Sequence, residues 1–171
     1  TVGGGVYEII ERQKEERPFK IGAALEVVKV LVRNKAKYAD RIPAEKLTDV
    51  WEDVIGDDSI DIVVEVMGGI EPARTYIKAA LEKGKHVVTA NKDLMAMHGH
   101  ELLELAGEHH CDLLFEAAVA GGIPIIRPLK QCLAGNNITE IMGIINGTTN
   151  FILTKMKEDG MDFGEALQLA T

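Results

Sequence analysis

Three short apolar runs most strongly constrain the fold of this chain. Each of the first two is followed by a turn and a helical pattern, and the third is followed by a segment of small, mostly uncharged residues. The runs cover residues 60–67, 86–90 and 111–115, and apolar residues at helical spacing cover 71–83 and 94–110 between them. Short strands that alternate with helices are typical of a parallel sheet with helices on both faces. The sequence therefore predicts an α/β fold built on a doubly wound parallel sheet.

The region before these runs adds a helix and a strand to the same pattern. Residues 2–14 place apolar side chains at helical spacing, and residues 23–32 are typical of a buried strand. Residues 41–57 are polar and predict a loop with a short helix at Asp49–Ile55. The predicted order begins with a helix, so we expect the opening strand of a doubly wound sheet to be absent from this sequence.

The composition of the sequence changes after residue 115. Residues 116–124 are small and apolar, with Glu116 as the single charge. The elements predicted beyond them are a helix, a strand and two more helices, over residues 125–133, 138–145, 151–157 and 163–170. We therefore predict a first domain at residues 1–115 and the beginning of a second, α+β domain at residues 116–171.

Composition narrows the class of protein. The 171 residues are 46% hydrophobic and 27% charged, the balance of a soluble globular protein. Their net charge of −8 argues against general binding to nucleic acid or to a membrane surface, because both are negatively charged. No apolar run approaches the ~20 residues of a membrane span. Two cysteines without metal-ligand spacing predict no disulfide scaffold and favour the reducing cytoplasm.

Lys92 lies in the turn Thr89-Ala90-Asn91-Lys92, directly after the predicted strand at residues 86–90. In open α/β sheets, ligands bind in the crevice outside the carboxyl ends of the strands. A lysine in that position can point at a ligand, although an ordinary solvated lysine would occupy the same turn. The turn by itself leaves both interpretations open.

A basic turn follows the predicted strand at residues 23–32. It contains Arg33, Lys35 and Lys37 and has no acidic residue at its tip. In a dinucleotide-binding fold, an acidic residue here binds the ribose 2′-hydroxyl of NAD, whereas a basic residue accommodates the 2′-phosphate of NADP. The turn favours NADP over NAD, and a solvated basic turn would have the same composition.

Six motifs run through the chain in a fixed order. They are TVGGGV, VLVR, DIVVEVMGGIEPA, GKHVVTANKDLMA, FEAAVAGGIPII and GIINGTTNFIL. Each alone is weak, but together, in register over the whole chain, they resemble homoserine dehydrogenase. Proteins of that family are longer at both ends, so we expect this chain to be a fragment of a longer protein.

The resemblance implies an NAD(P)-binding Rossmann domain followed by a substrate-binding and dimerisation domain. It implies an enzyme that interconverts L-homoserine and L-aspartate 4-semialdehyde by hydride transfer with NADP, or with NAD, in threonine, methionine and isoleucine biosynthesis. The expected partners are a small amino-acid substrate and a second copy of the chain in a cytoplasmic homodimer, with neither nucleic acid nor membrane.

The resemblance also assigns cofactor binding to residues that match the family's motifs. These are Thr1, Val2, Gly3, Arg33, Met67, Gly68, Thr89, Asn91 and Lys92. Met67 and Gly68 are expected to border the nicotinamide, and Arg33 to contact the adenosine phosphate. Lys92 is also the expected catalytic residue, because an ammonium near the reacting carbon can orient the substrate and stabilise charge on its oxygen.

Two further sites follow from the resemblance. Asn146, Gly147 and Thr148 match a loop expected to orient the amino-acid substrate, and the alternative is that Thr148 is merely the N-cap of the next helix. A monovalent cation such as sodium is expected to bind one carboxylate and several backbone carbonyls, those of Glu116, Val119, Gly121 and Ile123. The alternative for Glu116 is a cap at the hinge between the domains.

The residues that transfer protons in the family are expected beyond Thr171, so we expect the isolated chain to be weakly active or inactive. Two other functions remain open. Another Rossmann oxidoreductase, such as aspartate-semialdehyde dehydrogenase, needs a nucleophilic cysteine at the strand ends, and neither Cys111 nor Cys132 lies in such a loop. A non-catalytic nucleotide-binding module would have less need of Lys92.

Overall fold

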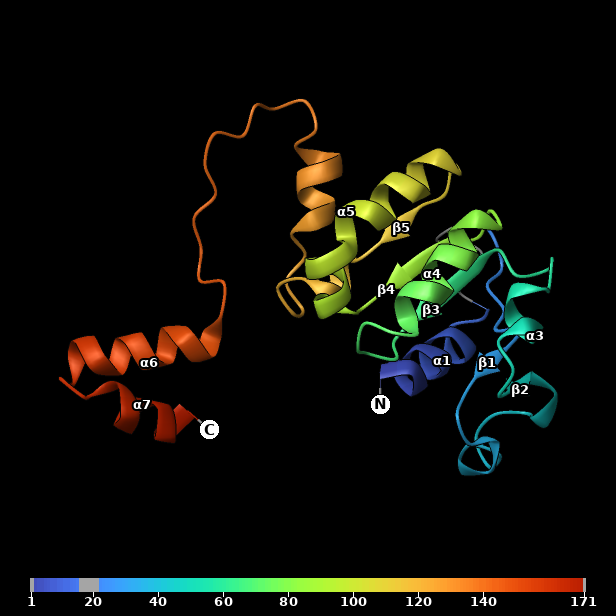
Figure 1. Ribbon diagram of the computed structural model, residues 1–171, viewed down its shortest axis with the longest axis horizontal. Coiled ribbons are helices and arrows are strands. Elements are labelled where there is room, and N and C mark those ends of the chain that lie inside the picture. The colour runs from blue at the N-terminus through green and yellow to red at the C-terminus, as the bar shows by residue number, and fades with distance from the viewer. Residues whose placement is uncertain (1, 16–21, 171) are drawn as a thin grey trace. The chain divides into compact units, whose positions relative to one another are not determined.

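The computed structural model describes residues 2–15 and 22–170 of the chain (Figure 1). It divides into two compact units, residues 1–126 and residues 127–171. The domain boundary expected after residue 115 stays a prediction. Each unit is described below by itself.

The first unit is built on a parallel sheet of three strands in the order β3-β4-β5. These strands are β3 (Ile62–Glu65), β4 (His86–Thr89) and β5 (Leu113–Leu114). Two helices connect them, α4 (Ala73–Glu82) and α5 (Lys92–Glu108). The predicted alternation of strands and helices is confirmed here, with strands somewhat shorter than the apolar runs.

The core of this unit lies where α4 and α5 pack on one face of the sheet and against each other (Figure 1). Ile77 and Leu81 of α4 lie one helical turn apart and are fully buried. Leu94 of α5 and Val87 of β4 are also fully buried against them. Each such side chain contributes roughly 1.5–3 kcal/mol by leaving water. This packing fixes the strand ends that carry the candidate site.

A second, two-stranded parallel sheet lies outside this core. It pairs β1 (Val30–Leu31) with β2 (Leu47–Thr48). The prediction of a strand over residues 23–32 is therefore wrong for all but two of its residues. A strand extends only as far as its hydrogen-bonding partner, and β2, which lies in the predicted loop, has only two residues.

Four helical elements accompany this small sheet in the sequence. Helix α1 (Val2–Arg12) and the short α3 (Glu52–Ile55) confirm the two helices predicted in this part of the sequence. Two 3-10 turns, η1 (Lys35–Lys37) and η2 (Ala44–Lys46), lie within the connection between β1 and β2. The polar sequence of that connection, which predicted a loop, is consistent with these single turns.

The second unit contains a five-residue π-helix, η4 (Pro128–Cys132), and two helices, α6 (Gly147–Glu158) and α7 (Phe163–Ala170). Helices α6 and α7 pack together and bury Ile152 and Ala166. None of the helices in the described part of the chain has the length and apolar character needed to cross a membrane.

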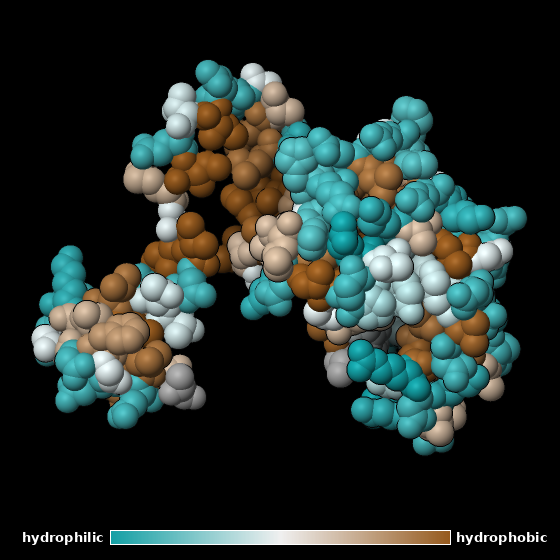
Figure 2. Space-filling view, in the orientation of Figure 1, coloured by the Kyte–Doolittle hydropathy of each residue, from teal (hydrophilic) through white to brown (hydrophobic). Residues whose placement is uncertain are grey.

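The strand predicted at residues 138–145 is wrong. Residues 137–146 have no regular secondary structure, and the side chains of Ile141 and Ile145 are 65% and 97% exposed. Figure 2 shows hydrophobic residues along this extended segment. The sequence has strand-like alternation, but no described residue pairs with it, and an isolated strand cannot satisfy its backbone hydrogen bonds.

Candidate functional site

The carboxyl ends of β3 and β4 meet at one edge of the sheet, because Glu65 is the register partner of Thr89. The turn after β3 carries Met67 and Gly68, and the turn after β4 carries Asn91 and Lys92. Residues that are separate in the sequence and were assigned to the cofactor site thus converge here. This is the edge where open α/β sheets bind ligands.

The buried carboxylate of Glu65 joins the two turns. Its Oε1 accepts hydrogen bonds from the backbone N–H of Met67 at 2.7 Å and of Gly68 at 3.3 Å. Its Oε2 accepts one from the Thr89 hydroxyl at 2.7 Å. Sequence reasoning missed this residue. The available signal was an acidic residue inside an apolar strand, since a carboxylate there must find donors.

Asn91 connects the same turns to helix α5. Its Oδ1 accepts from the Leu94 N–H at 3.1 Å, which makes it the N-cap of the helix. Its Nδ2 donates to the Gly69 carbonyl at 2.6 Å, and its own N–H donates to Thr89 Oγ1 at 3.0 Å. The Asn91 side chain is therefore engaged in holding the turns together. Its expected contact with the cofactor stays a prediction.

The turn after β3 needs its glycines. Gly68 and Gly69 have φ values of +75° and +77°, in the left-handed region that side chains rarely adopt. The backbone can therefore reverse direction immediately after Met67. This reversal leaves the Met67–Gly68 backbone at the edge of the sheet rather than in the core.

Lys92 is the first residue of α5, and its side chain is exposed. It forms no hydrogen bond or ion pair with any other described residue. Its ammonium is therefore available for a ligand at the strand end, and the free N–H groups of the first helical turn add positive potential there.

The start of α1 lies beside the same edge. A Cβ on Gly3 would come within 3.2 Å of Val66 Cγ2, just after β3, so glycine allows the helix to approach closely. Val2 begins the helix and is 62% exposed. Thr1 lies outside the described residues. The structure thus brings Gly3 beside Val66, the residue before Met67.

The basic turn after β1 has one unpaired guanidinium. Arg33 is exposed and makes no ion pair with another described residue. Lys35 behaves differently, because its Nζ lies 2.7 Å from Asp49 Oδ1. The hydrogen bond from Lys35 lowers the pKa of Asp49. Arg33 is therefore the better candidate for a phosphate contact.

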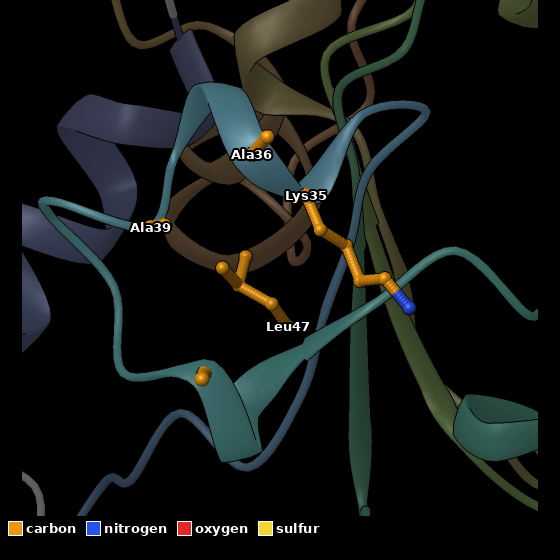
Figure 3. A pocket seen from close by; sticks show the side chains of 5 residues that line it. Lys35, Ala36, Ala39 and Leu47 are labelled. Carbon is orange, nitrogen blue, oxygen red and sulfur yellow. The ribbon is translucent and has the colours of Figure 1, made fainter.

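A shallow pocket lies inside the same turn (Figure 3). It is lined by Lys35, Ala36, Ala39, Ala44 and Leu47. Figure 3 shows the Lys35 side chain extending away from Ala39. None of the residues assigned to the cofactor, the substrate or the cation lines this pocket. It is an apolar hollow between two single-turn helices, separate from the candidate site.

Glu116 closes the loop that was expected to bind a cation. Its Oε1 accepts from the backbone N–H groups of Ile125 at 2.6 Å and Ile126 at 2.9 Å. The carbonyls of Val119, Gly121 and Ile123 accept no backbone hydrogen bond from the described residues. These three acceptors are compatible with a hard cation. Within the described ranges, no three His, Cys, Asp or Glu side chains gather as a metal site.

The expected substrate residues begin helix α6 in the second unit. Asn146 Oδ1 accepts from the Thr149 N–H at 2.8 Å, so Asn146 is the N-cap. The alternative that Thr148 is the N-cap is wrong, because the helix starts at Gly147, four residues before the predicted start at residue 151. All three residues assigned to the substrate are exposed.

Two models of known protein families match this chain. The family model for the homoserine dehydrogenase NAD-binding domain matches residues 1–116, and the model for homoserine dehydrogenase matches residues 124–171. The chain belongs to the homoserine dehydrogenase family. It is 48% identical to the homoserine dehydrogenase of Bacillus subtilis over an alignment that covers 99% of this chain and 40% of that protein.

Solved structures of homoserine dehydrogenases agree with this assignment. The Thiobacillus denitrificans enzyme superimposes with a TM-score of 0.83 at 46% identity, over 99% of this chain and 39% of that one. A hyperthermophilic archaeal homoserine dehydrogenase in complex with NADPH has a TM-score of 0.74 at 29% identity, over 98% of this chain and 56% of that one. The predicted α/β class and Rossmann-like NAD-binding domain are confirmed. The chain spans about 40% of the length of the curated relatives.

Proposed function

We propose that the complete polypeptide containing this chain interconverts L-homoserine and L-aspartate 4-semialdehyde with NADP, or with NAD. The observation that supports this most is the edge of the sheet, where the unpaired ammonium of Lys92 stands beside the turn of Met67 and Gly68. Membership of the homoserine dehydrogenase family supports the reaction, and the convergence of these residues supports this edge of the sheet as its site.

The residues present fit a dinucleotide. Glycine at position 3 allows the start of α1 to lie close to Val66, where a Cβ would be crowded at 3.2 Å, and the first N–H groups of α1 lie there as donors. Val2, Gly3 and Thr1 would border the pyrophosphate, and Arg33 would meet the adenosine 2′-phosphate, which favours NADP over NAD. When bound, the nicotinamide supplies or accepts the hydride.

Lys92 would act on the substrate oxygen at C4. During reduction of the aldehyde, negative charge develops on this oxygen, and a fixed ammonium stabilises that charge more in the transition state than in the ground state. The N-cap by Asn91 fixes the helix end that carries Lys92. Lys92 is proposed to orient the substrate and to stabilise charge on its oxygen, and not to supply the proton.

The amino-acid part of the substrate would bind at Asn146, Gly147 and Thr148, whose backbone and hydroxyl donors begin α6. Sodium would bind the carbonyls of Val119, Gly121 and Ile123, with Glu116 holding the loop closed. A homodimer in the cytoplasm belongs to the same proposal.

The alternative of an aspartate-semialdehyde dehydrogenase needs a nucleophilic cysteine, and the surroundings of Cys111 do not suit that role. Burial, followed by the charge of Asp112, raises the pKa of the Cys111 thiol, which opposes formation of a thiolate at neutral pH. Its Sγ is also close to two backbone carbonyls, of Leu81 at 3.8 Å and of His109 at 3.4 Å. These contacts indicate a structural cysteine.

The test is an assay of the complete polypeptide in both directions, with NADPH or NADH and L-aspartate 4-semialdehyde and with NADP or NAD and L-homoserine. We expect turnover in both directions and a preference for the 2′-phosphorylated cofactor. Calorimetry with the same compounds separates the functions. Nucleotide binding that is unaffected by homoserine, without turnover, would support the non-catalytic module instead.

A further inference from the structure

Glu65 is a buried carboxylate that the proposed reaction does not use. It is 4% exposed and lies at the last position of β3. No lysine or arginine in the described part of the chain pairs with it. Among the described residues, the carboxylate of Glu65 accepts hydrogen bonds from two backbone N–H groups and one hydroxyl. Burying a carboxylate in this way has a cost that an apolar strand residue would avoid.

The contacts to Oε1 fix the direction of two peptide groups. In a trans peptide, the N–H and the C=O point in opposite directions. Because the N–H groups of Met67 and Gly68 point at Glu65, the carbonyls of Val66 and Met67 point away from it. Neither carbonyl accepts a backbone hydrogen bond from the described residues. Glu65 thus leaves two oriented acceptors at the edge of the sheet.

The contact to Oε2 fixes the neighbouring turn. The Thr89 hydroxyl donates its proton to Glu65, so its oxygen is free to accept from the N–H of Asn91. Asn91 in turn caps the helix that begins at Lys92. One carboxylate therefore sets both the acceptor pair after β3 and the start of the helix after β4.

We propose that Glu65 is a positioning residue that orients the carbonyls of Val66 and Met67 to accept hydrogen bonds from the nicotinamide–ribose half of the cofactor. The nicotinamide–ribose half carries hydroxyl and carboxamide N–H groups, and these would donate to the two carbonyls. Glu65 itself does not touch the cofactor. The inference rests on the proposed function, because it presumes that a nicotinamide nucleotide binds at this edge.

The Glu65→Gln variant of the complete polypeptide tests the proposal. Glutamine keeps the shape but has one acceptor oxygen, so its NH₂ group must face either the two backbone donors or the Thr89 hydroxyl. We expect NADPH to bind about 10-fold more weakly. Adenosine 2′,5′-bisphosphate, which lacks the nicotinamide half, should bind within about twofold of wild type. Glu82→Gln, at the exposed end of α4, is the matched control and should alter neither affinity.

The outcomes separate the two proposals. Wild-type protein that binds neither NADPH nor NADH contradicts the proposed function and Glu65's role with it. Wild-type protein that binds NADPH, with unchanged binding in Glu65→Gln, overturns only the role of Glu65. Equal weakening of both nucleotides indicates a purely structural residue and also overturns it.

A second variant keeps the test usable if Glu65→Gln does not fold. Thr89→Val removes the contact to Oε2 and the acceptor of the Asn91 N–H, and it leaves the Met67 and Gly68 contacts to Oε1 in place. We expect a loss of NADPH affinity smaller than that of Glu65→Gln, with adenosine 2′,5′-bisphosphate unaffected. Equal losses for the two nucleotides would contradict the proposal.

Discussion

Each unit begins a helix at its candidate site with an asparagine cap, but the two caps lie in different surroundings. Asn91 is 5% exposed, and its amide also donates to Gly69 of the neighbouring turn. Asn146 is exposed, and its side-chain oxygen accepts a hydrogen bond from Thr149 of its own helix. The first cap connects two strand ends, whereas the second orders one helix end.

The same contrast holds for the apolar residues of the two units. In the first unit, β4 lies between two parallel strands and under two helices. In the second, residues 137–146 are exposed throughout. A hydrophobic pattern or a helix cap therefore forms part of a buried core only where neighbouring elements pack against it. The following predictions test this contrast, from the largest expected effect to the smallest.

The largest difference is expected between two leucines on helices. Leu94→Ala removes a fully buried side chain from the first core and should lower the free energy of unfolding by about 3 kcal/mol. Leu153→Ala, at a position 58% exposed on α6, should change it by less than about 0.5 kcal/mol. Urea unfolding of the whole chain, followed by circular dichroism, measures both. Equal effects would remove the contrast between the units.

The two caps should differ by a smaller amount. Asn91→Ala removes the cap and leaves the Gly69 carbonyl without its donor, so we expect a loss of about 2 kcal/mol. Asn146→Ala removes an exposed cap and should cost about 1 kcal/mol or less. The exposed Asn137→Ala serves as the control for both. A larger loss for Asn146 than for Asn91 in the same unfolding experiment would contradict the account.

The smallest effect concerns Glu101, between α4 and α5. Hydrogen bonds from Lys78 and Arg74 lower its pKa from 4.5 to about 2. Because the folded pKa is the lower one, its contribution to stability is complete above about pH 4.5 and is lost as the pH falls toward about 2. Glu101→Gln should flatten the decline of the urea midpoint over this range. Glu104→Gln, with a side chain 67% exposed, should keep the wild-type slope.

The sequence predicted those elements whose partners are also strands and helices of this chain. The runs at residues 60–67, 86–90 and 111–115 became β3, β4 and β5 because each lies beside another. The run at 138–145 has equally good alternation but no partner among the described residues. The run at 23–32 was limited by the two residues of β2. Pairing is not contained in the pattern of a single strand.

The sequence predicted only part of the candidate site, because some of its contacts also depend on how the elements meet. The ends of β3 and β4 could be placed together, because parallel strands end at one edge of a sheet. The role of Glu65 could not, because it depends on the direction of two backbone N–H groups after the strand. The cap at Asn146 instead of Thr148 was missed because the helix starts earlier than its apolar pattern.

The most direct test of the central claim is the kcat of Lys92→Met in the complete polypeptide, measured as NADPH consumed with L-aspartate 4-semialdehyde. We predict a fall of about 100-fold, with a change in the Kd of NADPH of less than about tenfold, because the ammonium acts mainly on developing charge. Lys157→Met, on the exposed side of α6, should retain wild-type kcat. A Lys92→Met enzyme with wild-type kcat would contradict the account.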